Sequence, residues 1–160
     1  MEISAGTLTA EAFAWFGDVV EAPAHSGRAY FSTSLGNLRS AAPPKLWMLT
    51  KQPSPFLPLR IETLERHAFS SQTFVPIDIG RWLVVVAPSD PQGGPDVARA
   101  QAFLPSPQQG VSYRPNVWHS GLHVFDRAAR LTVFMWLDGT AADEEIVPVS
   151  PFTVHEATAS

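Results

Sequence analysis

The stretch L-E-R-H-A-F-S-S-Q-T-F-V-P at residues 64–76 joins the end of one predicted strand to the start of the next through a short polar turn. Glu65 and His67 are two residues apart, so on a strand their side chains project from the same face. Gln72 follows just after the two serines of the turn. A carboxylate, an imidazole and an amide that converge on one cavity are typical of a site for a hard metal ion or a polar substrate. The alternative is that Glu65 is a solvated charge and His67 a hydrogen-bonded structural residue.

Short strands joined by turns are predicted on both sides of this stretch. The chain contains 15 prolines, and proline interrupts helix interiors and central strands, so it collects at turns and strand ends. Residues 81–87 contain the apolar run W-L-V-V-V-A, which is typical of a strand buried on both faces. In residues 59–66 the alternation places Leu59, Ile61, Thr63 and Glu65 on one face. Further strands are predicted at residues 18–21, 45–51, 73–77, 110–113, 117–124, 131–137 and 145–149, and this pattern favours a sandwich or barrel.

Two helices are predicted beside these strands. Residues 7–16 form the first, with Thr9 as its N-cap and Gly17 at its end. Residues 96–103 form a second, short helix. Residues 23–44 have a weak pattern and are predicted to be loop, with room for a short strand near Tyr30. The tail from Ser150 is expected to be frayed or ordered by partner contacts.

A second polar segment, Q-G-V-S-Y-R-P-N-V-W-H-S-G, spans residues 109–121. Gly110 permits a close backbone approach, and Pro115 with Asn116 predicts a turn. His119 then returns the chain to a strand, where it and its neighbour Trp118 face opposite sides. The alternative is an ordinary hairpin in which His119 and the nearby His123 are structural.

Composition limits the class of protein. A length of 160 residues corresponds to one domain, residues 1–160. The net charge of −4 argues against nucleic acid as a partner, and no apolar stretch approaches the roughly 20 residues of a membrane span. There is no cysteine and no signal peptide pattern, so a cytoplasmic location is expected. Only 16 % of the residues are charged, which predicts an apolar interface and a homodimer, with the five tryptophans in the core or at that interface. The acidic run at residues 143–145 predicts a solvated turn.

Taken together, the two polar segments resemble the two motifs of the cupin barrel. In cupins the first motif supplies two histidines two residues apart and then a carboxylate, and the second supplies one histidine after a Gly-to-Pro turn. Here Glu65 stands at the first histidine position and Gln72 at the carboxylate position. The other matching residues are His67, Gly110, Pro115 and His119.

Over residues 7–150 the chain is further similar to the ureidoglycolate lyase family. The similarity is carried by L-T-A-E-A-F-A-W-F-G-D-V-V-E at 8–21, E-R-H-A-F-S-S-Q-T-F-V-P at 65–76, W-L-V-V-V-A-P at 82–88 and G-V-S-Y-R-P-N-V-W-H at 110–119. This resemblance implies a mostly β fold: a cupin-type double-stranded β-helix (jelly-roll) barrel with one or two short helices.

The resemblance also implies an activity, the cleavage of (S)-ureidoglycolate to glyoxylate and urea, a late step of allantoin breakdown. The small-molecule substrate is a carbinolamide, so the reaction needs a base for the hydroxyl proton and an acid for the leaving nitrogen. A divalent metal, such as nickel, manganese or zinc, can bind the carboxylate and hydroxyl together and lower the hydroxyl pKa.

Candidate roles follow from this chemistry. His67, Gln72 and His119 are expected to bind a metal or substrate oxygens, with Glu65 as a fourth ligand or the general base. Tyr113 is expected to donate a hydrogen bond to the developing carbonyl oxygen. Either Arg114 or Lys51 is expected to pair with the substrate carboxylate.

Two alternative functions remain open at this point. One is a different cupin enzyme that acts on another small hydroxy acid or amide. The other is a non-catalytic cupin that binds a small molecule. Fold alone does not decide between such functions.

Overall fold

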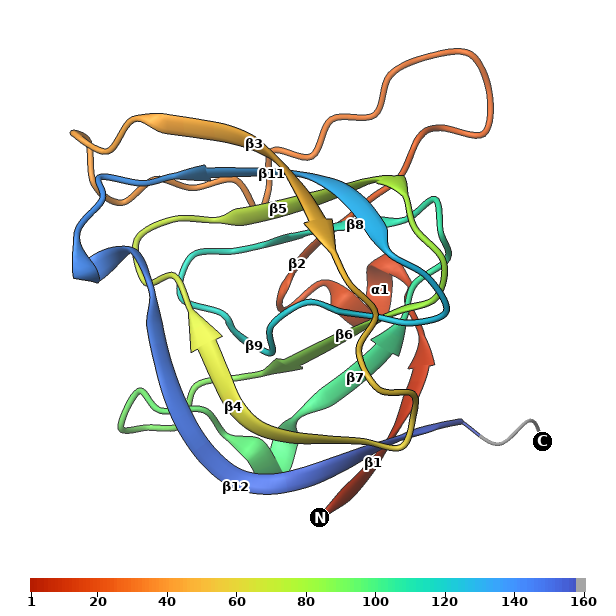
Figure 1. The fold of residues 1–160 in the computed structure, drawn as a ribbon. Coiled ribbons are helices and arrows are strands. Elements are labelled where there is room, and N and C mark those ends of the chain that lie inside the picture. The colour runs from red at the N-terminus through yellow and green to blue at the C-terminus, as the bar shows by residue number, and fades with distance from the viewer. Residues whose placement is uncertain (158–160) are drawn as a thin grey trace.

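The computed structural model describes residues 1–157 and consists mainly of strands in two sheets (Figure 1). The strands are β1 (Glu2–Thr7), β2 (Gly17–Val20), β3 (Pro44–Lys51), β4 (Leu59–Arg66), β5 (Gln72–Asp78), β6 (Trp82–Ala87), β7 (Gln101–Leu104), β8 (Gly110–Tyr113), β9 (Trp118–His119), β10 (His123–Val124), β11 (Ala129–Trp136) and β12 (Glu145–Glu156). The helical turns are α1 (Ala10–Phe13), η1 (Val97–Arg99) and η2 (Ala141–Asp143). Among the described residues, no helix is long and apolar enough to cross a membrane.

The larger sheet closes on itself. Its strand order is β10-β6-β7-β1-β12-β4-β9, and β9 also pairs with β6, so six of the strands form a ring. The inside of this ring is filled by apolar side chains, among them Ile61, Val85, Trp118, Phe152 and Val154. Closure leaves these six strands with partners on both sides and so removes free edges there.

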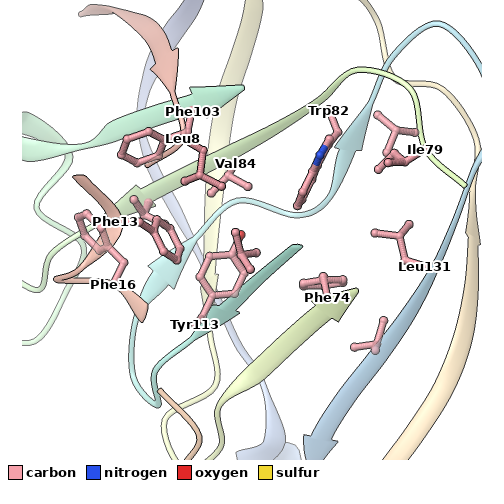
Figure 2. Packing of buried hydrophobic residues seen from close by; sticks show 14 of the residues in the cluster. Leu8, Phe13, Phe16, Phe74, Ile79, Trp82, Val84, Phe103, Tyr113 and Leu131 are labelled. Carbon is pink, nitrogen blue, oxygen red and sulfur yellow. The ribbon is translucent and has the colours of Figure 1, made fainter. Parts of the chain in front are cut away.

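The smaller sheet, β2-β8-β5-β11-β3, packs against the outside of that ring. A second core fills the space between the two sheets, and Figure 2 shows Trp82 and Val84 of β6 gathered there with Phe74, Tyr113 and Leu131. All six residues of β6 are buried because Leu83, Val85 and Ala87 face the ring interior while Trp82, Val84 and Val86 face the second core. The predicted mostly β barrel and its fully buried central strand are confirmed.

The predicted alternation of buried and exposed side chains in β4 is wrong for the second half of the strand. Leu59 and Ile61 face the ring interior as expected, but Leu64 continues that buried face and Thr63 is exposed. The register between β4 and β12 shifts between Pro148 and Phe152, so the alternation of β4 changes phase there. Glu65 consequently lies on the opposite side of the strand from Leu64.

The helix predictions were only partly correct. Thr9 does cap α1, accepting a hydrogen bond from the Ala12 amide at 3.1 Å, but the helix covers only Ala10–Phe13. The segment predicted as a helix at 96–103 is a single 3-10 turn followed by strand β7, because pairing with β6 and β1 overrides its local preference. No strand forms near Tyr30, and the strand predicted at 117–124 is broken into β9 and β10.

Both ends of the described chain belong to the closed ring. Strand β1, which was not predicted, runs parallel to both β12 and β7. Strand β12 continues to Glu156, so the expected fraying from Ser150 is wrong for residues 150–156. Residues 158–160 lie outside the described part. Phe152 and Val154 explain the extended strand, since both are buried in the ring core.

This assignment predicts that Phe152→Ala lowers the free energy of unfolding by about 3–5 kcal/mol through lost burial and a cavity. Ile146→Ala, on the same strand but 56 % exposed, should cost less than about 1 kcal/mol. Urea unfolding followed by tryptophan fluorescence measures both. Equal losses for the two variants would contradict the placement of β12 in the ring.

Candidate active site

The two polar segments of the sequence meet where the sheets adjoin. Glu65 on β4 is directly opposite His119 on β9 in the larger sheet. Gln72 on β5 is directly opposite Tyr113 on β8 in the smaller sheet. Strand pairing thus brings Glu65 beside His119, and a side-chain contact between Gln72 and His119 joins the two sheets, so the expected convergence of Glu65, Gln72 and His119 is present.

His119 lies at the centre of this cluster and is 2 % exposed. Its Nδ1 lies 2.9 Å from the Val117 carbonyl oxygen, to which a protonated Nδ1 donates. Its Nε2 lies 3.0 Å from Gln72 Oε1 and 3.3 Å from Glu65 Oε1. The Tyr113 ring stacks on the imidazole with centroids 4.2 Å apart and planes 13° from parallel. Packing and hydrogen bonding together hold this ring in one orientation.

His67 follows the end of β4 and presents its ring to the same space. Its Nδ1 lies 2.8 Å from the carbonyl oxygen of Asp143, and the ring centroid is 5.4 Å from that of His119. Its Nε2 is buried and has no hydrogen-bond partner among the described residues. Such an orphaned buried acceptor costs free energy unless something binds to it.

The donor set fits a metal ion. Ligand atoms of Glu65, His67 and His119 all lie within 4.8 Å of one another. Each imidazole can donate a hydrogen bond from a protonated Nδ1 to a backbone carbonyl oxygen. The lone pair on Nε2 is then available to a cation, as is usual for histidine ligands. The Gln72 amide nitrogen donates to Met135 Sδ at 3.4 Å, so its Oε1 faces His119 as a further acceptor. With both histidines neutral the cluster contains only acceptors, and a cation satisfies all of them.

The electrostatics favour an ionised Glu65 and a neutral His67. Burial raises the pKa of Glu65, but the His119 hydrogen bond and the charges of nearby histidines outweigh it and hold that pKa below its usual value. Burial, aided by the charge of His119, lowers the pKa of His67. Burial raises the pKa of Tyr113 far above its usual value, with the Glu65 charge acting in the same direction. At neutral pH the site therefore presents a carboxylate, a neutral His67 and a protonated phenol.

His123, for which the sequence suggests only a structural role, also lies at this site. It lines a cavity of about 330 Å³ together with Glu65, Thr63, Gly121 and Ile146. Its Nδ1 lies 3.4 Å from Ser54 Oγ. Burial, and then the positive charge of Lys51, lower its pKa to about 4 although Glu65 acts in the opposite direction. Lys51, at the end of β3, thus lies on the same side of the site. The only sequence signal for His123 is its position four residues after His119.

Arg114 does not join the cluster. Its guanidinium donates to the carbonyl oxygens of Ala14 at 2.6 Å and Trp15 at 3.0 Å, and its amide donates to the Phe16 carbonyl. Arg114 therefore ties the end of α1 to β8. A larger cavity, about 760 Å³, lies on that side beside Trp15 and Arg99. None of the candidate ligands Glu65, His67, Gln72 and His119 lines this cavity. The smaller cavity beside Glu65 is therefore the better candidate for the active site.

The low pKa of His123 predicts an acid-sensitive fold. Above the unfolded-state pKa of about 6.5 the residue is neutral in both the folded and the unfolded state, so its full contribution to the free energy of unfolding is present. As the pH falls toward 4, the unfolded chain binds the proton first, so the free energy of unfolding decreases by roughly 3 kcal/mol. Urea unfolding near pH 7 and near pH 4.5 should show a smaller loss for His123→Gln than for the parent. His25→Gln, at an exposed histidine, is the control, and equal losses in all three proteins would contradict the assignment.

Comparison with known proteins identifies the family. A dTDP sugar isomerase from Desulfovibrio desulfuricans G20 superposes with a TM-score of 0.49 at 14 % identity, over 83 % of this chain and 82 % of the isomerase. A putative ureidoglycolate lyase from Agrobacterium fabrum is 33 % identical over 147 residues, 92 % of this chain and 90 % of the relative. A ureidoglycolate lyase from Chelativorans sp. is 34 % identical over 163 residues, 96 % of each chain. The family model described as ureidoglycolate lyase matches residues 1–155. The chain therefore belongs to the ureidoglycolate lyase family.

Proposed function

We propose that this protein cleaves (S)-ureidoglycolate to glyoxylate and urea, with a divalent metal held by Glu65, His67, His119 and the amide oxygen of Gln72. The observation that carries the proposal is the convergence of two buried imidazoles and one partly buried carboxylate, whose ligand atoms all lie within 4.8 Å of one another. These residues lie in the segments that give the chain its family resemblance. The relatives named above as ureidoglycolate lyases support the choice of substrate.

The reaction breaks the bond between the carbinol carbon and a urea nitrogen. The hydroxyl proton leaves, and the hydroxyl oxygen becomes the carbonyl oxygen of glyoxylate. The electron pair of the broken bond stays with the urea nitrogen, which takes up one proton for the one that the hydroxyl loses, so the reaction neither releases nor consumes a proton overall. No covalent intermediate with the protein and no added water are needed.

Each side chain has a defined task in this reaction. Glu65, ionised and lining the cavity, is assigned to the metal through one carboxylate oxygen and accepts the hydroxyl proton with the other. Tyr113 remains protonated and is assigned to donate a hydrogen bond to the developing carbonyl oxygen. Lys51 is assigned to the substrate carboxylate, since Arg114 is engaged by the end of α1. When bound, the metal would lower the pKa of the substrate hydroxyl.

Nickel, manganese and zinc are the candidate metals. The set combines two imidazole nitrogens with carboxylate and amide oxygens, a mixture that all three ions accept. The set contains no thiolate, because the chain has no cysteine.

We also propose that the protein is a cytoplasmic homodimer that buries the outer face of the smaller sheet. Leu46 and Met48 on the edge strand β3 are 70 % and 66 % exposed, and Val75 and Ile77 on β5, separated from β3 by β11, are also exposed. Apolar side chains gathered on one sheet face are typical of an interaction surface. The edge strand β3 has β11 as its single neighbour in the sheet order.

The activity is tested by measuring glyoxylate release from ureidoglycolate with nickel, manganese or zinc added. The parent protein should release glyoxylate and urea in equal amounts. Glu65→Gln and His119→Ala should each lower kcat/KM by roughly 10²-fold or more, because each removes a charged acceptor or a ligand. His25→Gln should match the parent. No release above background with any of the three metals would contradict the proposed activity.

The interface is tested by Met48→Glu, which places a charge on the edge strand of the exposed apolar face. The parent should sediment as a dimer in analytical ultracentrifugation and the variant as a monomer. Arg60→Glu, at an exposed position on β4 of the larger sheet, should remain dimeric. A parent protein that sediments as a monomer at micromolar concentration would contradict the proposed dimer.

A further inference from the structure

Arg39 forms a clamp behind His67 that joins distant parts of the chain. Its Nη1 lies 2.8 Å from Asp138 Oδ2, and its Nη2 is hydrogen-bonded to Asp143 Oδ1. The side chains of Arg39 and Asp143 are only 17 % and 15 % exposed. A guanidinium shared between two carboxylates in partly buried surroundings is a strong and directional contact. It connects the loop that follows β2 to the turn between β11 and β12.

The near side of the clamp is fixed to the chain beside His67. The Arg39 amide donates to Asn37 Oδ1 at 3.0 Å, and the Leu38 amide donates to the Phe69 carbonyl at 2.8 Å. The guanidinium carbon lies 5.2 Å from the centre of the Phe69 ring. Phe69 is two residues after His67, so Arg39 is held against the segment that carries the imidazole.

The far side of the clamp is the turn that ends at Asp143. Asp143 Oδ2 accepts a hydrogen bond from the Gly139 amide at 2.7 Å, and Gly139 has a positive φ of 82°. The 3-10 turn η2 has no buried residue. Apolar packing therefore does little to hold this turn in place, and polar contacts such as those of Arg39 decide its position.

The carbonyl of Asp143 accepts the hydrogen bond from His67 Nδ1 at 2.8 Å. We propose that Arg39 is a positioning residue for His67, because the clamp holds this carbonyl where it keeps the imidazole proton on Nδ1 and the lone pair on Nε2. Which ring nitrogen of a histidine carries the proton is set by the hydrogen bond of the other nitrogen. The effect on metal affinity rests on the proposed function of the site, whereas the effect on the tautomer does not.

Arg39→Met tests the proposal, since methionine fills space without charge or hydrogen bonds. In metal-free protein labelled with ¹⁵N at histidine, NMR at neutral pH should show His67 protonated at Nδ1 in the parent. In Arg39→Met a substantial part of His67 should shift to the Nε2-protonated form. Zinc affinity, measured by titration, should fall about 10–100-fold, as is usual when a partner of a ligand is removed. Arg39→Lys, which keeps the charge but not the planar fork, should lie between the two proteins.

Arg130→Met is the matched control, because it removes an exposed ion pair with Asp78 (3.0 Å) away from the site. It should leave both the His67 tautomer and zinc affinity unchanged. If Arg39→Met lowers the melting temperature while the tautomer and zinc affinity stay at parent values, the proposal is wrong and the clamp is only structural. If Arg39→Met does not fold, Asp143→Asn gives the same test, since it keeps the backbone carbonyl and weakens the ion pair. A parent protein that binds zinc but does not cleave ureidoglycolate would overturn the proposed function and leave this test intact.

Discussion

The pairing of His119 with two strands at once is the constraint on which the rest of the structure depends. Its position in β9 is opposite Val86 of β6 on one side and Glu65 of β4 on the other. This double pairing closes the ring of the larger sheet and at the same time brings a carboxylate beside an imidazole. The fold and the site are thus made by the same hydrogen-bonded contact, and neither can change register without the other.

Burying the polar side chains of the site costs free energy unless each has a hydrogen-bond partner or binds a cation. His67 and His119 are almost fully buried, and the carboxylate and amide oxygens around them are acceptors. A buried acceptor without a donor costs about 1–3 kcal/mol. Apolar packing inside the ring and between the two sheets offsets this cost, and a bound cation would remove it. The neutral state that burial imposes on His67 is also the state that a metal ligand requires.

Local patterns predicted what depends on local physics. The continuous apolar run of β6, the cap of α1 and the polar segments around His67 and His119 could all be predicted from the sequence. Strand β1 could not, because both of its partners, β7 and β12, lie far along the chain. Strand β7 could not either, because pairing with β1 and β6 overrides its local preference for a helix. For the same reason the sequence does not show that Arg114 is hydrogen-bonded to the end of α1. It also predicts a solvated acidic turn at Asp143, whose carboxylate in fact accepts a hydrogen bond from Arg39.

The two sides of the site have opposite requirements, and different parts of the chain meet them. The imidazole side needs fixed nitrogens, which strand pairing, the stacked Tyr113 and the Asp143 carbonyl provide. The cavity side needs groups that an anionic substrate can reach, and there His123 lines the cavity with Glu65 while the positive charge of Lys51 acts on His123. Lys51 is the last residue of β3 and His123 the first of β10, so each adjoins a loop, and loops tolerate change more easily than the interiors of paired strands. Relatives that act on different small acids would therefore differ first around Lys51 and His123, and would keep the register of Glu65 and His119.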